Sequence, residues 1–179
     1  MHRNKDFYMV DSNKIRIVPD FPTEGIKFYD ITTVLGDPTE FQNVFQVLLT
    51  KAKKMNPDVI VALEARGYFF APALALELKI PFAPIRKKGK LPFVTYMETY
   101  NLEYGQASIE IHNDAIKPHS RVLLFDDVLA TGGTAKAAVN LINHFDPQEI
   151  TALFYVELPE LNGREKLKEV KNIVSLIRV

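Results

Sequence analysis

The sequence contains no cysteine and no tryptophan among its 179 residues. Without cysteine the chain can form no disulfide framework, no thiolate zinc site and no cysteine nucleophile. Net charge is missing too, because 22 Lys and Arg residues balance 22 Asp and Glu residues. This balance argues against a nucleic-acid partner and against an acidic disordered tail, so any electrostatic function must come from local clusters.

Long apolar runs are also lacking. No stretch approaches the roughly 20 apolar residues that cross a membrane, and the positively charged first residues are not followed by the apolar segment of a signal peptide. We therefore expect a cytoplasmic protein with no membrane partner. The 4 histidines show no metal-ligand spacing, so we assign them to the surface or to structural roles.

Short apolar runs alternate with helical patterns along the chain, and the length suits a single domain over residues 1–179. Because such alternation builds βαβ units, we expect an α/β fold: a mainly parallel twisted sheet with helices on both faces. Prolines at one strand indicate an edge position or irregular ends. The predicted strands are 59–63, 80–85, 106–112, 121–125, 149–156 and 172–177, and the predicted helices are 68–78 and 134–145.

The most informative segment is VLLFDDVLATGGT, residues 122–134. It places Asp126 and Asp127 at the carboxyl end of a strand, where open α/β sheets bind ligands. The glycine loop and the helix start that follows offer free N–H groups, which with the threonine hydroxyls form an anion site. Carboxylates beside a phosphate would serve sugar hydroxyls, a cation or a developing positive charge. The alternative is a plain helix cap.

Residues 122–134 resemble the phosphoribosyl diphosphate signature of the type I phosphoribosyltransferases. Further segments, in matching order and spacing, are similar to the adenine phosphoribosyltransferases of that family, and the resemblance covers about residues 15–178. These segments are IVPDFPTEGIKFYDI (17–31), EARG (64–67), IRKKGKLP (85–92), LEYG (102–105), VEL (156–158) and GREKL (163–167).

The resemblance implies purine salvage: transfer of ribose 5-phosphate from 5-phosphoribosyl 1-diphosphate to adenine, giving AMP and diphosphate. It also implies a homodimer, and Mg²⁺ held mainly by the substrate rather than by a metal site of the protein. A base-binding hood would lie at residues 15–36, and a flexible catalytic loop at residues 91–105.

The resemblance also assigns catalytic roles. Asp126 and Asp127 would grip the ribose hydroxyls and offset developing positive charge, and Glu103 would transfer a proton at the base. The phosphoribosyl group would be bound by Asp126, Asp127, Ala130, Thr131, Gly132, Gly133 and Thr134.

A basic turn at residues 86–90 carries four cationic side chains in a protein of zero net charge. A solvated surface turn is the plain alternative, but the resemblance implies diphosphate binding here, with Arg86 able to reach a neighbouring subunit. It also implies a cis peptide bond between Glu64 and Ala65. Arg66 could instead pair with Glu64 or Glu77. The implied diphosphate-binding residues are Ala65, Arg66, Arg86, Lys87, Lys90 and Tyr104.

Adenine would lie between Phe28, which stacks on the purine, and the apolar Leu158, with Lys27 and Tyr29 contributing contacts. Tyr29 stands where the family pattern has arginine, and Ala71 where it has glycine. These departures leave the base contacts and the polarity of the interface open. Two other functions stay open as well: a transferase for another purine, and a regulator that binds phosphoribosyl diphosphate without turnover.

Overall fold

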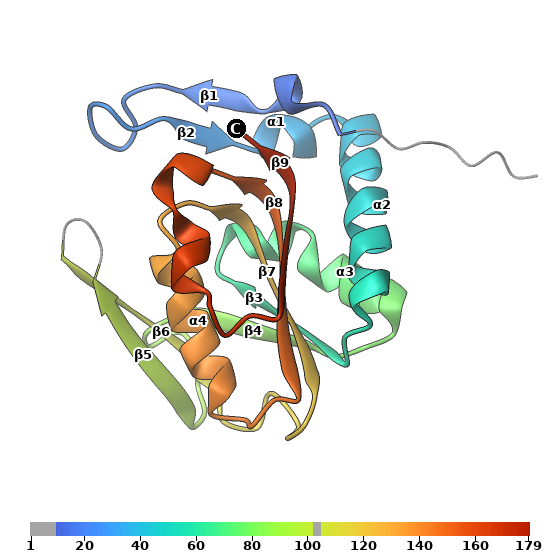
Figure 1. The fold of residues 1–179 in the computed structure, drawn as a ribbon, viewed down its shortest axis with the longest axis vertical. Coiled ribbons are helices and arrows are strands. Elements are labelled where there is room, and N and C mark those ends of the chain that lie inside the picture. The colour runs from blue at the N-terminus through green and yellow to red at the C-terminus, as the bar shows by residue number, and fades with distance from the viewer. Residues whose placement is uncertain (1–9, 102–104) are drawn as a thin grey trace, which may run out of the picture. The chain divides into compact units, whose positions relative to one another are not determined.

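The computed structural model describes residues 10–101 and 105–179 (Figure 1). The chain divides into two compact units, residues 1–48 and 49–179. The boundary falls inside the long helix α2, Pro38–Met55. No helix in the described part of the chain is both long enough and apolar enough to span a membrane.

The first unit contains the segment expected as a hood. Strands β1 (Arg16–Val18) and β2 (Phe28–Asp30) form a two-stranded antiparallel sheet. The short helix α1 (Thr32–Leu35) follows directly, and the carboxylate of Asp30 accepts a hydrogen bond from the backbone N–H of Thr32 at 3.0 Å. This hydrogen bond ties the end of β2 to the start of α1.

Helix α2 was not among the predicted helices. Its buried side chains nevertheless recur at helical spacing, with Val44, Leu48, Ala52 and Met55 all turned away from solvent. Charged and polar residues between these positions conceal the apolar stripe in the sequence. Asp37 caps the helix, accepting hydrogen bonds from the N–H groups of the first turn.

The second unit is built on a seven-stranded sheet in the order β5-β6-β4-β3-β7-β8-β9. The five strands from β4 to β9 in this order run parallel, whereas β5 and β6 form an antiparallel hairpin that pairs with the end of β4. The predicted mainly parallel α/β fold is confirmed. The strands are β3 (Val59–Leu63), β4 (Phe82–Lys87), β5 (Thr95–Asn101), β6 (Gln106–His112), β7 (Arg121–Leu129), β8 (Glu149–Glu157) and β9 (Asn172–Arg178).

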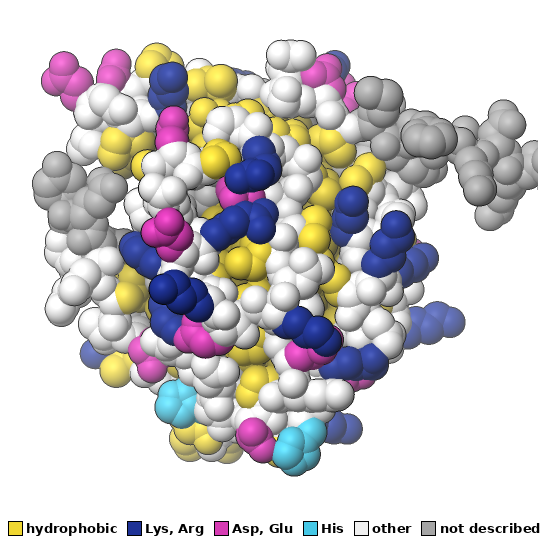
Figure 2. Space-filling view, viewed as in Figure 1, with side chains coloured by type: hydrophobic (Ala, Val, Ile, Leu, Met, Phe, Trp, Pro, Cys, Tyr) yellow, Lys and Arg dark blue, Asp and Glu magenta, His cyan; other side chains and the backbone are white. Residues whose placement is uncertain are grey.

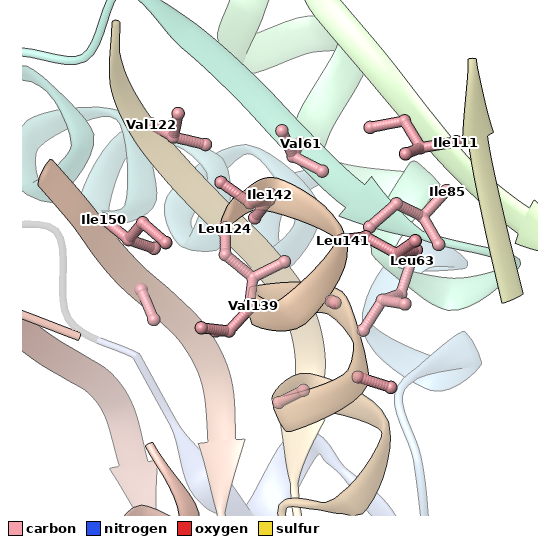
Figure 3. Close-up of a cluster of buried hydrophobic side chains, with 14 of the residues drawn as sticks. Val61, Leu63, Ile85, Ile111, Val122, Leu124, Val139, Leu141, Ile142 and Ile150 are labelled. Atoms are coloured by element: carbon pink, nitrogen blue, oxygen red, sulfur yellow. The ribbon is translucent and has the colours of Figure 1, made fainter. Parts of the chain in front are cut away.

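One face of this sheet packs against helix α4, Gly133–Asn143. Val61, Leu63 and Leu124 point from the central strands toward Leu141 and the other apolar residues of α4, and together they form a buried cluster (Figure 3). Because side chains alternate between the two faces along a strand, the neighbouring residues in sequence point to the opposite face of the sheet. The core on the α4 face thus fixes the start of the helix at the carboxyl end of β7.

The opposite face is covered by the 3₁₀ turn η2 (Arg66–Phe69) and helix α3 (Ala71–Leu78). The ring of Phe70, between these two elements, meets Phe125 of β7 edge-on at 6.3 Å and Tyr155 of β8 at 6.0 Å. Helices therefore cover both faces, as predicted, and η2 is anchored beside the end of β3.

Three further elements, besides α2, differ from the sequence-based expectations. Residues 95–101, expected inside a loop, form β5. Strand β7 continues through both aspartates to Leu129, because Asp126 still pairs with Phe154 of β8. Strand β4 lies inside the sheet rather than at its edge. It tolerates Pro84 because its ladder with β6 covers only Arg86 and Lys87.

Charges of both signs are interspersed on the face drawn in Figure 2. Lys and Arg side chains lie near Asp and Glu side chains over much of this face, and hydrophobic side chains are visible between them. This agrees with the zero net charge of the sequence.

Candidate active site

The loop that joins β7 to α4 turns tightly at Gly132. This residue has a φ of +74°, which a side chain rarely tolerates. A Cβ atom here would also lie only 2.4 Å from the backbone oxygen of Gly163. Glycine is thus required for two reasons. The turn leads directly into α4, whose first N–H groups have no acceptor within the helix.

A cavity of about 200 Å³ opens at this loop. Nearly all of the residues predicted to bind the phosphoribosyl group line this cavity. Arg66 of η2, which carries a guanidinium group, lines it as well. Backbone N–H groups, two threonine hydroxyls and one carboxylate converge here, a combination suited to a phosphorylated sugar. The cavity is lined by Arg66, Asp126, Val128, Leu129, Ala130, Thr131, Gly132, Gly133, Thr134 and Ala135.

The two aspartates have different surroundings. Asp126 lines the cavity, whereas Asp127 is 2% exposed and forms an ion pair with Arg66, whose Nε lies 2.9 Å from Oδ2. Successive strand residues point to opposite faces, which explains the division. Arg66 therefore pairs with Asp127, and not with Glu64 or Glu77 as the alternative prediction held.

The aspartate pair concentrates negative charge in little space. Burial raises the pKa of Asp126 well above its usual range, and the charge of Asp127 adds to this effect. Burial also raises the pKa of Asp127, against the opposing influence of Arg66. Asp126 accepts the N–H of Asp127 at 2.9 Å. Such a carboxylate favours hydroxyl donors or positive charge in the cavity.

The basic turn after β4 is held by a carboxylate from the neighbouring strand. Glu64, at the end of β3, accepts hydrogen bonds from Nε and NH2 of Arg86 at 3.1 and 3.3 Å, and from the N–H of Lys87 at 3.1 Å. The hydrogen bonds of Arg86 lower the pKa of Glu64. The peptide bond between Glu64 and Ala65 is cis, as the resemblance implied.

A second carboxylate fixes the backbone of the same turn. Glu110 of β6 is 5% exposed and accepts the N–H groups of Lys90 and Leu91, both at 2.9 Å. Although burial alone would raise its pKa, these backbone donors together lower it. The turn is thereby held rigid while the side chains of Lys87 and Lys90 stay exposed.

The residues predicted to contact the base lie in both units. In the first unit, Phe28 is half-buried and meets Phe21 edge-on at 5.2 Å, Tyr29 is half-buried beside it in β2, and Lys27 is exposed. In the second unit, Leu158 follows β8 and is 7% exposed. The predicted Glu103 and Tyr104 lie outside the described residues.

Sequence reasoning missed two carboxylates that organise this region. The roles of Glu64 and Glu110 depend on strands that are distant in sequence. Only the position of Glu110 in an otherwise alternating strand, next to apolar residues, could have indicated a buried polar group. The segment 163–167 was quoted for its resemblance, but no role was predicted for Gly163.

Comparison with known proteins shows the family. The phosphoribosyl transferase domain family matches residues 42–177. The chain is 49% identical to the adenine phosphoribosyltransferase of Parvibaculum lavamentivorans, over 86% of this chain and 88% of that protein.

Two solved structures agree with the fold. The adenine phosphoribosyltransferase of Thermoanaerobacter pseudethanolicus is 44% identical, with a TM-score of 0.88 over 93% of this chain and 96% of that one. The enzyme of Saccharomyces cerevisiae, in complex with an imino-altritol bisphosphate and adenine, is 39% identical, with a TM-score of 0.83 over 92% and 94%. The chain therefore belongs to the phosphoribosyl transferase family, among the adenine phosphoribosyltransferases.

Proposed function

We propose that the cavity beside Asp126 binds the ribose 5-phosphate part of 5-phosphoribosyl 1-diphosphate, and that the chain transfers this group to adenine to give AMP and diphosphate. The observation that carries this proposal is the single cavity that contains both the glycine loop and Asp126. The choice of adenine is supported by the yeast relative, which was solved with adenine bound.

The loop of residues 130–134 would hold the 5-phosphate. The loop leads into the N-terminus of α4, which is the positive end of the helix dipole. The N–H groups of the loop and this dipole together favour an anion. Thr131 and Thr134 line the same cavity, and the Thr131 hydroxyl can donate to a phosphate oxygen. The Thr134 hydroxyl donates to the Tyr100 hydroxyl at 3.3 Å and would exchange that acceptor for the phosphate. Charge-assisted hydrogen bonds of this kind are about twice as strong as neutral ones.

The aspartates would act on the ribose. Asp126 lines the cavity and can accept hydrogen bonds from ribose hydroxyls. The charge of Asp126, together with that of the buried Asp127 that Arg66 holds, would offset the positive charge that develops on the sugar as the diphosphate leaves with its bonding electrons. A ring nitrogen of adenine then forms the new bond to the anomeric carbon and loses its proton. Glu103 is our candidate for the group that handles this proton.

The leaving diphosphate would meet the basic turn and η2. Arg66 lies in the cavity already, and the exposed Lys87 and Lys90 extend the positive charge beyond it. Arg86 is held by Glu64, so we assign it to the wall of the site, with a contact to diphosphate when Glu64 releases it. Ala65 and Tyr104 complete the proposed set.

Mg²⁺ fits this site as an ion carried by the substrate. Asp126 and Asp127 offer the hard oxygen ligands that Mg²⁺ prefers, and Mg²⁺ is commonly bound through one or two carboxylates and substrate phosphates. Among the residues that the structure describes, no cluster of three or more His, Asp or Glu could hold a metal ion. When bound, Mg²⁺ would neutralise charge on the departing diphosphate.

The base, the assembly and the compartment complete the proposal. Phe28 and Leu158 would contact the adenine ring, with Lys27 and Tyr29 beside them. We propose a homodimer that works in the cytoplasm.

A panel of bases tests the proposed function. Purified protein is mixed with Mg²⁺, phosphoribosyl diphosphate and each of adenine, hypoxanthine, guanine and xanthine, and nucleotide and diphosphate are measured. We expect turnover with adenine alone. Turnover with another base would overturn the assignment of Phe28 and its neighbours, and tight binding of phosphoribosyl diphosphate with no turnover would favour a regulator.

A further inference from the structure

The phosphate loop rests directly on a second glycine turn that is distant in sequence. Gly163 begins the 3₁₀ turn η4, Gly163–Lys166. A Cβ atom on Gly163 would lie 2.2 Å from the backbone oxygen of Ala130 and 3.1 Å from the backbone nitrogen of Gly132. Since a Cβ on Gly132 would in turn lie 2.4 Å from the oxygen of Gly163, the two backbones touch with no side chain between them.

The residue after Gly163 anchors this turn to the sheet. The Nε and NH2 groups of Arg164 donate to the two carboxylate oxygens of Glu157 at 2.6 and 2.7 Å. Its NH1 group donates to the backbone oxygen of Ile173 in β9 at 3.0 Å, and NH2 also reaches the hydroxyl of Ser175 at 3.4 Å. The guanidinium is thus committed to the last residue of β8 and to Ile173 and Ser175 in the first half of β9.

Glu157 makes this anchor rigid. It is the last residue of β8 and is 2% exposed, and a buried carboxylate requires a charged partner that also donates hydrogen bonds. Arg164 supplies this partner, and Arg178 lies 3.6 Å from the second oxygen. A two-pronged contact between planar groups fixes orientation as well as distance.

We propose that Gly163 and Arg164, held by Glu157, form a loop brace that positions the backbone of residues 130–132 for the phosphoribosyl group. The proposal rests on the proposed function of that loop. Gly163 and Arg164 are positioning residues, because they act through the loop backbone. No side chain at position 163 could fill the space without moving the Ala130 carbonyl by most of an ångström.

The first test is Gly163→Ala in the full chain, with ribose 5-phosphate as the binding probe. The added methyl group must displace the loop, and a shift of about 1 Å in a binding group can weaken function up to about 100-fold. We expect the Kd for ribose 5-phosphate and the KM for phosphoribosyl diphosphate to rise at least about tenfold. The KM for adenine should stay within about threefold, a split that general loss of folding would not produce.

Ser120→Ala is the control. Ser120 lies just before β7, at the amino end of the sheet and outside the proposed site, and its hydroxyl donates to the backbone oxygen of Lys117 at 2.7 Å. This variant should retain wild-type values for both substrates. If Gly163→Ala folds and binds ribose 5-phosphate as tightly as the wild type, or if both KM values rise equally, the brace is wrong.

Substitutions of Arg164 provide a second test of the loop brace, and this test remains available if Gly163→Ala does not fold. Arg164→Lys keeps the charge beside Glu157 but loses the two-pronged contact, so it should weaken ribose 5-phosphate binding by several-fold. Arg164→Met should weaken binding further. The control is Arg121→Met, which removes a comparable two-pronged contact to Asp58 at the amino end of the same sheet. If Arg164→Lys and Arg121→Met bind ribose 5-phosphate alike, the brace is overturned.

Failure of the proposed function would look different, because it is read from the wild-type chain. A wild-type chain that neither binds ribose 5-phosphate nor forms AMP would overturn the proposed function and the brace together. A wild-type chain that does both, beside a Gly163→Ala variant that also does both normally, would overturn only the brace.

Discussion

The two ends of the parallel sheet use the same charged groups in opposite ways. At the amino end, Asp58 precedes β3 and receives three hydrogen bonds from Arg121, the first residue of β7. These bonds lower the pKa of Asp58 to about 2. At the carboxyl end of β7, Arg66 forms an ion pair with Asp127, while burial and the neighbouring charge of Asp127 raise the pKa of Asp126.

The difference separates a structural role from a functional one. At the amino end, the three hydrogen bonds from Arg121 stabilise the ionised form of Asp58. The carboxylates at the other end are crowded, and their charge favours a ligand that brings hydroxyl groups or positive charge. Perturbed pKa values that coincide with a cavity are typical of functional sites. The comparison therefore predicts large activity effects at one end of the sheet and small stability effects at the other.

The largest effect is expected from Asp126→Asn combined with Asp127→Asn. Removing both negative charges should lower kcat/KM at least about 100-fold, or about 2.7 kcal/mol in transition-state stabilisation, because nothing then offsets the charge on the sugar. Steady-state AMP formation measures this. Circular dichroism must show that the variant is folded, and near-wild-type activity in the folded variant would remove the pair from the mechanism.

The next largest effect is expected at the basic turn. Glu110→Ala leaves the N–H groups of Lys90 and Leu91 without their buried acceptor, which should destabilise the chain by about 1–3 kcal/mol. A looser turn should also raise the KM for phosphoribosyl diphosphate more than that for adenine. Thermal unfolding and steady-state kinetics test both points. An unchanged melting temperature would show that the turn does not depend on Glu110.

A smaller effect of opposite sign is expected for Asp126→Asn alone. The folded chain binds a proton at Asp126 more tightly than the unfolded chain does, so the stability from this group is present at low pH and is lost as pH rises. At pH 7, where the unfolded chain has released this proton, the raised pKa of Asp126 leaves the fold less stable than it is at low pH. The variant, which keeps an acceptor for the N–H of Asp127, should therefore melt about 2–4 °C higher than the wild type.

The gain should shrink as the pH is lowered toward about 4, where the carboxyl group of the unfolded wild-type chain begins to bind a proton as well. Melting curves from pH 4 to 8 follow this trend. If Asp126→Asn is less stable than the wild type at pH 7, the two neighbouring carboxyl groups do not destabilise the folded chain and this prediction is wrong.

The smallest effect is expected at the amino end. Asp58→Asn removes an ion pair whose carboxylate is 43% exposed, and exposed pairs contribute less than about 1 kcal/mol. The lowered pKa means that this stability is present above about pH 4 and is lost as pH falls toward 2. Urea unfolding at pH 7 and pH 3 should show a smaller difference between variant and wild type at the lower pH. A loss of several kcal/mol, or of activity, would contradict the comparison.

How far the sequence predicts the molecule depends on how local each signal is. The apolar run of β3 and the alternation of β6 gave correct strand bounds, because one face or both faces are buried. Strand β5 was missed because the resemblance assigned residues 91–105 to a flexible loop, although Tyr96 and Tyr100 pack against the core and tyrosine favours strands. Strand β7 was predicted too short because paired aspartates look like a strand end.

The site divides in the same way. The glycine loop of residues 130–134 is contiguous, and its position in a cavity with Asp126 followed from local pattern. The contacts of Arg66 with Asp127 and of Arg86 with Glu64 join separate strands, so no local pattern specifies them. The approach of Gly163 to Gly132 is a matter of ångström-scale packing between segments that the sequence does not order in space.

The most direct test is where the phosphorylated sugar binds. Backbone amide NMR spectra of the ¹⁵N-labelled chain, recorded during titration with ribose 5-phosphate and Mg²⁺, report this for every assigned residue. We predict saturable shifts concentrated at residues 130–134 and at Asp126, with Asp58 and Arg121 unaffected. Shifts that spare the loop after β7, or that fall equally on both ends of the sheet, would contradict the assignment of the site.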